Sequence, residues 1–386
     1  MHIRAAVPRC PVLAVALSAA VIASLLPRAA RAQNALTTWR ATEEWRVDGS
    51  EAGEPFADIR DMVVTRDGTS WLLSFNDQVI RRYDRNGKVL SSVGRKGSGP
   101  GEMRNANGLV VASDGKVWVS DPSNARISVF NANGTFARQH TLAINGYGWR
   151  WEAWLDRTTG TVVDPFTNIR TGARSTSDWR HVTNAGVIKD SIAPPSCASG
   201  SAPAYFGYRA ETKNKGAMSS QYPFSGGGGT APDGRGAMWC AVPASSRAAL
   251  VRIGRNDTIA HSAIVLPRVP VTAAERDSAI AAARTRVAKY ETNDFDAAKI
   301  PTSKPPIALL SVDDDGRLWI QHTRRSGERS TTYDVHDRTG KHLGRLRLPR
   351  RSGSYGVPVR ATKDALWVVE LDDDDVVTLA KYRLGS

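Results

Sequence analysis

Long apolar runs are almost absent from this sequence of 386 residues, and the clear example, Val12 to Leu26, lies near the N-terminus. Arg4 and Arg9 precede this run, and the segment PRAARAQ follows it. A basic start, an apolar stretch and a small-x-small end are typical of a secretory signal peptide. We therefore expect residues 1–32 to be removed by cleavage after Ala32. This predicts a periplasmic or secreted protein with no membrane span in its mature chain; an uncleaved anchor is the alternative.

Cysteine is scarce, with 3 residues in the whole chain. Cys10 precedes the apolar run, where a lipoprotein cysteine would follow it, so the mature chain keeps only Cys197 and Cys240. In an oxidising compartment, an isolated pair of this kind favours a disulfide. Two free buried thiols are the alternative interpretation.

Blocks of like charge are missing, although the formal net charge is +14. Removing Arg4, Arg9, Arg28 and Arg31 with the signal peptide lowers this charge to +10, and the remaining Lys and Arg residues are spread along the chain. A diffuse basic excess favours anionic surfaces or polymers, or is simply a solvated exterior. Because the protein is predicted to be exported, we expect no nucleic-acid partner.

An internal repeat is the most informative feature that the sequence does contain. VVTRDGTSWLL, which begins at Val63, returns as VVASDGKVWVS, which begins at Val110. Each copy is an apolar run that ends at Asp-Gly, a dipeptide suited to tight hairpin turns, and a second strand follows. A weaker copy begins at Trp151. Each of the other copies contains a Trp at the equivalent position, which we expect in the core: Trp71, Trp118, Trp239, Trp319 and Trp367.

Six such units predict an all-β fold, a six-bladed β-propeller of four-stranded antiparallel blades. The last unit lacks a fourth strand, whereas residues 37–47 alternate in polarity and belong to no other unit. We expect this N-terminal segment to close the sixth blade, because pairing would hide two sheet edges. Residues 33–386 then form a single domain.

The glycine-rich stretch GRKGSGPG at residues 94–101 resembles a phosphate-binding loop at first sight. It lacks the Gly-Lys-Ser/Thr ending of a Walker loop and the third glycine of a dinucleotide fingerprint. No helix is expected after it, and phosphate loops use a helix N-terminus. We interpret it as a blade connector; an anion-accepting nest beside Arg95 and Lys96 is the alternative.

Residues 94–136 resemble an NHL repeat. The resemblance is carried by the connector glycines, by Asp-Gly after the first strand, and by Asp-x-x-Asn-x-Arg before the third: Gly97, Gly99, Gly101, Gly108, Asp114, Gly115, Asp121, Asn124, Arg126 and Phe130. The match weakens in the other units. It implies an NHL-like six-bladed propeller similar to exported bacterial proteins, in a family that includes binding modules, metal-dependent lactonases and lyases.

Two functions remain open from the sequence. The first is a non-catalytic binding module with no catalytic residues, which takes a protein, carbohydrate or small-molecule ligand and acts as a monomer. The alternative is a metal-dependent hydrolase or lyase of the lactonase type, whose divalent cation, such as Ca²⁺, would lie at the channel mouth near Asp61, Asn107 and Asp121. The binding residues predicted for that face are Arg60, Asp61, Asn107, Asp121, Asn124 and Trp149.

Two insertions interrupt the repeat, and both are blade connectors expected on the ligand-binding face. Residues 191–229 have the composition of an irregular loop. Residues 267–306, between the fourth and fifth blades, contain a helix predicted over Ala273 to Glu291, because Thr272 and Glu275 form a capping box. We expect this helix to lie over the channel as a lid or rim, or to be a structural plug.

Overall fold

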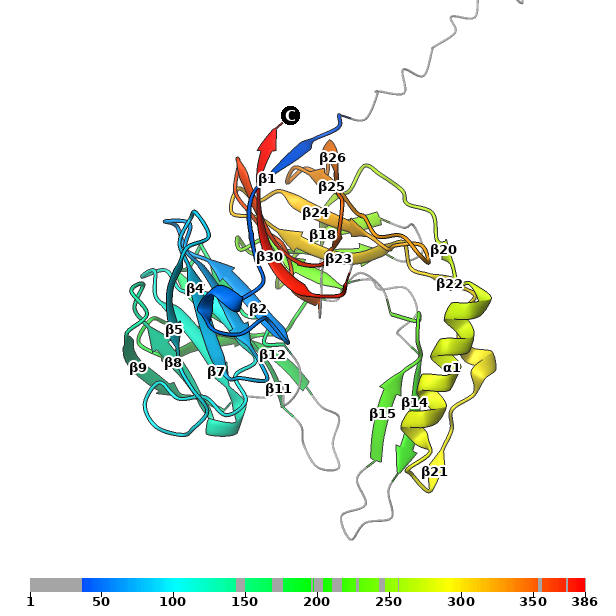
Figure 1. Ribbon diagram of the computed structural model, residues 1–386, viewed down its shortest axis with the longest axis horizontal. Coiled ribbons are helices and arrows are strands. Elements are labelled where there is room, and N and C mark those ends of the chain that lie inside the picture. Colours follow the sequence, from blue (N-terminus) through cyan, green and yellow to red (C-terminus); the bar gives the residue numbers. More distant parts are fainter. Residues whose placement is uncertain are drawn as a thin grey trace, which may run out of the picture. The chain divides into compact units, whose positions relative to one another are not determined.

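The computed structural model describes residues 37–143, 150–168, 176–195, 197, 204–209, 217–226, 229–242, 247–255, 257–352, 356–372 and 374–385. Over these residues the chain is mostly antiparallel β-structure with one α-helix, α1 (Ala273–Val287) (Figure 1). None of the described helices has the length and apolar character needed to cross a membrane.

Two four-stranded sheets come first along the chain, and in each the strands pair in sequence order. They consist of β2 (Ile59–Val64), β3 (Ser70–Ser74), β4 (Val79–Tyr83) and β5 (Val89–Val93), then β6 (Gly108–Val111), β7 (Val117–Asp121), β8 (Arg126–Phe130) and β9 (Phe136–Thr141). Asp-Gly turns join the first two strands of each sheet, and Gly68 and Gly115 take φ values of 86° and 77°. Glycine adopts such positive φ values without the steric cost of a Cβ atom.

Three more four-stranded sheets follow the same order. They are β10 (Trp154–Asp156), β11 (Thr161–Asn168), β12 (Thr176–Val182) and β13 (Ile188–Ile192); β16 (Thr230–Pro232), β17 (Ala237–Val242), β18 (Arg247–Arg252) and β19 (Thr258–His261); and β23 (Ile307–Val312), β24 (Leu318–His322), β25 (Thr331–His336) and β26 (His342–Leu348).

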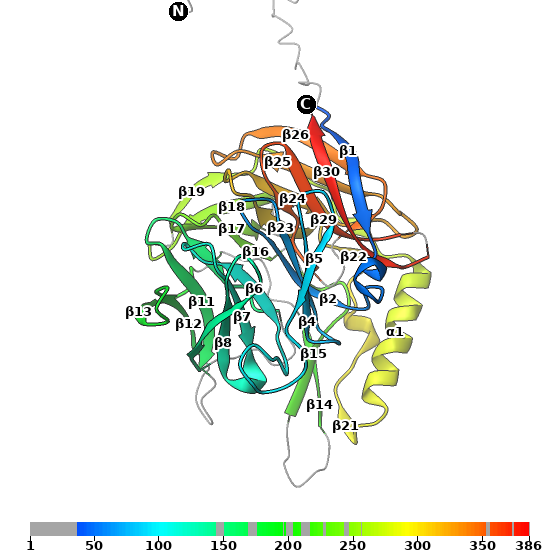
Figure 2. The same cartoon turned by 60° about the vertical axis from the view of Figure 1, so that its left-hand side comes forward.

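The last sheet combines strands from both ends of the described chain. Its strands are β27 (Arg351–Ser352), β28 (Arg360–Ala361), β29 (Ala365–Leu371), β30 (Val377–Gly385) and β1 (Arg40–Val47). β1 pairs antiparallel with β30, from Arg40 opposite Gly385 to Val47 opposite Leu379, and the two strands lie side by side in Figure 2.

The hydrophobic core lies between successive sheets. Trp71 of β3 packs in one cluster with Leu109 of the next sheet, and each later sheet shares a cluster with its successor in the same way. The last sheet shares its cluster with the first, because Trp367 packs together with Met62 and Leu72. The five repeated tryptophans are all buried, so they act as core residues.

The two insertions contribute a separate small layer. The strands β14 (Tyr205–Arg209), β15 (Ala217–Gln221) and β21 (Thr292–Asn293) pair with one another, and α1 lies alongside β14 and β15 (Figure 1). Thr272 caps the N-terminus of α1: its hydroxyl accepts from the Glu275 N–H, while the Glu275 carboxylate accepts from the Thr272 N–H. The shorter elements are β20 (Val269–Pro270), β22 (Ser303–Lys304), and the 3₁₀ turns Ser50–Ala52, Pro122–Asn124 and Ala297–Lys299.

A disulfide joins Cys197 to Cys240, with a Cα–Cα distance of 5.7 Å. Cys240 lies on β17 and is buried, whereas Cys197 lies in the connection that follows β13. The bridge therefore attaches the first insertion to the sheet that comes after it.

Candidate functional sites

The glycine-rich connector is held by the side chains of the Asp-x-x-Asn-x-Arg segment. Asp121 is fully buried, and its carboxylate accepts hydrogen bonds from the backbone N–H groups of Arg104 and Asn105. Asn124 donates its amide to Asp121 and to the carbonyl of Gly97. Both side chains thus stabilise the conformation of the glycine-rich connector.

Arg126 completes this arrangement. Its guanidinium donates to the carbonyl groups of Ser98, Gly99 and Glu102, at distances of 3.0, 2.6 and 2.8 Å. Glu102 in turn accepts from the N–H of Gly99 and pairs with Arg95. The connector is therefore ordered by charge-assisted hydrogen bonds from within the chain.

Asp61 is a second buried carboxylate. One oxygen accepts from the N–H of Met62 and the other from the N–H of Leu109, both at 2.9 Å. The guanidinium groups of Arg150 and Arg360 lie 3.7 and 3.6 Å from Oδ1. Asp61 therefore joins β2 of the first sheet to β6 of the second, and its charge is neutralised by two cations.

Asn107 was predicted to be a binding residue and so to face solvent or ligand. It is instead fully buried, and its backbone bonds to Ser120 and Trp151. Arg60 is partly exposed, and its guanidinium lies 4.0 Å from the centre of the Phe75 ring. Trp149, the remaining predicted binding residue, lies outside the described residues.

A metal held jointly by Asp61, Asn107 and Asp121 does not fit this geometry. The carboxylate oxygens of Asp61 and Asp121 are occupied by N–H donors from different segments, whereas a Ca²⁺ site needs several free oxygen ligands directed at one point. In the part of the chain that the structure describes, no three His, Cys, Asp or Glu residues form a group that could hold a metal ion.

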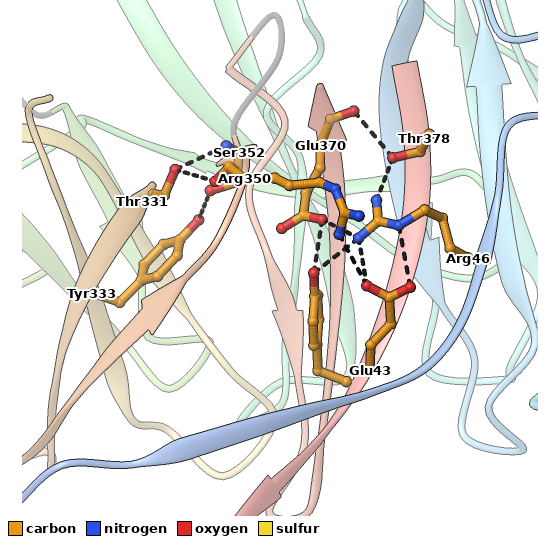
Figure 3. A network of polar contacts seen from close by, with 9 residues as sticks. Glu43, Arg46, Thr331, Tyr333, Arg350, Ser352, Glu370 and Thr378 are labelled. Carbon is orange, nitrogen blue, oxygen red and sulfur yellow. Dashed lines mark hydrogen bonds and ion pairs between the residues drawn. The ribbon is translucent and has the colours of Figure 1, made fainter. Parts of the chain in front are cut away.

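A buried polar network attaches β1 to the last sheet (Figure 3). Glu370 of β29 is fully buried, and its Oε2 atom accepts from Arg46 of β1 at 2.7 Å and from the Tyr382 hydroxyl at 2.9 Å. Burial raises the pKa of Glu370, against the opposing effect of the Arg46 guanidinium. Arg46 also bonds to Glu43 and Thr378, so the network fixes the position of β1.

The same view shows a separate buried hydrogen bond, between the hydroxyl groups of Tyr333 of β25 and Ser352 of β27 (Figure 3). Burial raises the pKa of Tyr333. Ser352 also donates its N–H to Thr331. This pair links the fifth sheet to the sixth, and each of its groups already has a partner within the protein.

A groove of approximately 650 Å³ lies between α1 and the β14–β15 layer. On the helix side it is lined by residues spaced four apart, which share one face of a helix. These are Ala274, Ser278, Ala282 and Arg286. Phe206 and Phe224 form part of the opposite wall.

Two charged residues of α1, Glu275 and Arg286, also line the groove. Arg286 donates to the Ser220 hydroxyl at 3.1 Å, and Glu275 forms an ion pair with Lys304. Beneath the groove, Ala283 and Val287 of α1 are buried in a cluster with Phe206 and Tyr222. These apolar residues of the helix therefore pack inward, while the small residues beside them leave the groove open.

Sequence reasoning missed this groove. The capping box indicated the helix, but the opposite wall comes from β14, β15 and the turn at Phe224, which belong to the other insertion. The spacing of Ala274, Ser278 and Ala282 was the available signal, since small residues every four positions leave one helix face flat.

Comparison with known proteins gives structural similarity alone. No protein-family model and no curated protein matches the chain. The structure of U3-55K is similar at a TM-score of 0.49 and 11% identity, with 89% of this chain and 98% of that one covered. A PQQ-bound aldose sugar dehydrogenase from Streptomyces coelicolor is similar at 0.45 and 12%, covering 90% and 99%. Virginiamycin B lyase from Staphylococcus aureus is similar at 0.43 and 11%, covering 89% and 99%. Similarity at this level assigns no function to the chain.

Proposed function

We propose that this protein is an exported six-bladed β-propeller that binds a small amphipathic anion in the groove beside α1, without catalysing its conversion. The order of the sheets supports the propeller, since each shares a core cluster with the next and the last with the first. In this proposal residues 1–32 are the signal peptide, and β1 is the closing strand of the sixth blade.

The observation that carries the proposal is the groove itself. Small-molecule sites have volumes of this order and are mostly apolar, with a few polar groups that fix the orientation of the ligand. Phe206 and Phe224 offer apolar contact, and Arg286 offers a guanidinium to a carboxylate or sulfonate. A ligand with an apolar body and one anionic group matches both features.

The test uses two fluorescent probes that share an apolar body. 8-Anilinonaphthalene-1-sulfonate carries a sulfonate, and N-phenyl-1-naphthylamine is its uncharged counterpart. Ala282→Phe should fill the groove and weaken both probes by about tenfold, which corresponds to about 1.4 kcal/mol. Arg286→Gln should weaken the sulfonate probe while leaving the neutral probe unchanged.

Ala281→Phe is the matched control, because Ala281 is exposed on the same helix and does not line the groove. Both alanine replacements carry the same small cost in helix propensity, so their melting temperatures should agree. Equal probe binding by Ala281→Phe and Ala282→Phe would refute the groove as the site.

A further inference from the structure

A second, smaller pocket lies at the junction of the fourth and fifth sheets and shares no residue with the groove. Its volume is approximately 190 Å³. Leu266 and Val269, from the connection after β19, form an apolar wall. His322, Arg324, Arg325 and Glu328, at the end of β24 and in the loop before β25, form a polar wall.

Asp334 holds His322 in this wall. The carboxylate of Asp334 is fully buried on β25, and its Oδ2 atom lies 2.8 Å from Nε2 of His322. Its Oδ1 atom meets Nε2 of His342 at 3.2 Å and Nε of Arg345 at 2.8 Å. An ionised carboxylate accepts only, so Nε2 of His322 is the donor in this pair.

The charge of the polar wall is positive. Burial and the neighbouring Arg351 lower the pKa of Arg324, and Glu328 opposes this effect. The Arg324 guanidinium also donates to the backbone carbonyl of Glu328 at 3.4 Å. Among the described residues, no carboxylate forms an ion pair with Arg324. Glu328, the acidic group of the wall, already accepts from the Arg325 N–H and the Ser330 hydroxyl.

We propose that this pocket is a binding site for a small organic carboxylate. The carboxylate would lie against Arg324 and Arg325, because guanidinium groups match its geometry. The short apolar body would contact Leu266 and Val269. The volume admits a molecule of a few heavy atoms. The site is independent of the groove beside α1, so either proposal can fail without the other.

The experiment is calorimetric titration of the full mature protein with butyrate, with butyramide as the neutral counterpart and with inorganic phosphate. Butyrate should bind saturably, and butyramide and phosphate should bind at least about tenfold more weakly, since the charge-assisted bonds or the apolar contacts are lost. Arg324→Gln should reduce butyrate affinity by about tenfold or more. Arg325→Gln, at an exposed position where folding is not at risk, should reduce it in the same direction.

Arg383→Gln provides the matched control, because Arg383 is exposed on β30 and the substitution removes the same charge. Butyrate affinity that is equal in Arg324→Gln, Arg325→Gln and Arg383→Gln would overturn the proposal. The absence of saturable butyrate binding would also overturn it. Phosphate that binds as tightly as butyrate would show an inorganic oxyanion site and would contradict the organic ligand proposed here.

Discussion

Asp334 shows how one side chain can join three neighbouring strands. It receives hydrogen bonds from His322 of β24 and from His342 and Arg345 of β26. Burial alone would raise the pKa of Asp334, but the hydrogen bonds from His322 and Arg345 outweigh burial and hold it well below its usual value. The ionised form is therefore the one that the fold stabilises.

Replacing Asp334 by Asn should lower the free energy of unfolding at pH 7 by about 3 kcal/mol, because Arg345 loses its buried partner. The folded-state pKa lies below the unfolded value of about 4. The contribution of Asp334 is thus complete above that pH and is lost as the pH falls toward the folded-state pKa. Urea unfolding at pH 7 and at pH 3 should show the difference between the wild type and Asp334→Asn shrinking at the lower pH.

Asp364→Asn is the control for this prediction, since Asp364 is exposed in a turn and its replacement should change stability by less than about 0.5 kcal/mol. An Asp334→Asn protein as stable as Asp364→Asn at pH 7 would contradict the assigned role.

Sequence reasoning found the positions of Asp61, Asn107 and Asp121 but assigned them the wrong surroundings. The alternation of side chains along a strand predicts which residues share a face of the sheet. β2 contains a register shift between Ile59 and Asp61, which changes the face on which the following side chains lie. Asp121 bonds to backbone groups 16 and 17 residues away, which no local pattern reveals. His322 and Asp334 likewise meet only because β24 and β25 pair.

At the scale of elements, turns and caps could be predicted far better than contacts. The Asp-Gly turns and the Thr272 capping box depend on adjacent residues, so the sequence contains all that they need. α1 ends at Val287, four residues before the predicted end at Glu291. The groove beside it depends on the meeting of two separate insertions, which tertiary packing decides.

β1 is the element whose loss should matter most. Deleting residues 37–47 would expose the edge of β30 and leave Glu370 without the Arg46 guanidinium. Exposed edges favour aggregation, so the truncated protein should yield no soluble monomer by size-exclusion chromatography. The milder Arg46→Ala variant should fold but lose about 3 kcal/mol, as expected when a buried charge loses its partner. A truncated protein that melts like the intact one would show that β1 is dispensable.

For the molecule as a whole, the Cys197–Cys240 disulfide reduces the conformational entropy of the unfolded chain. The two cysteines are 43 residues apart in sequence. Closing a loop of that size should stabilise the fold by about 4 kcal/mol on the chain-entropy model. The Cys197→Ala, Cys240→Ala double variant should lose most of this stability in urea unfolding, and reduction of the wild type should have a similar effect. Alkylation of both thiols in unfolded, unreduced protein would refute the bridge.

Because Arg40 and Gly385 are partners in the β1–β30 pairing, the chain can in principle be circularly permuted. A few residues would suffice to link Gly385 to Arg40, and new ends could be opened at the turn Asp114–Gly115, where no neighbouring atom lies within 4 Å of a Cβ added to Gly115. Such a rearranged gene would keep every strand pair while changing which sheet leaves the ribosome first. A permutant that folds would separate the order of synthesis from the final architecture, and a set of permutants would reveal which sheet must form before the others can assemble.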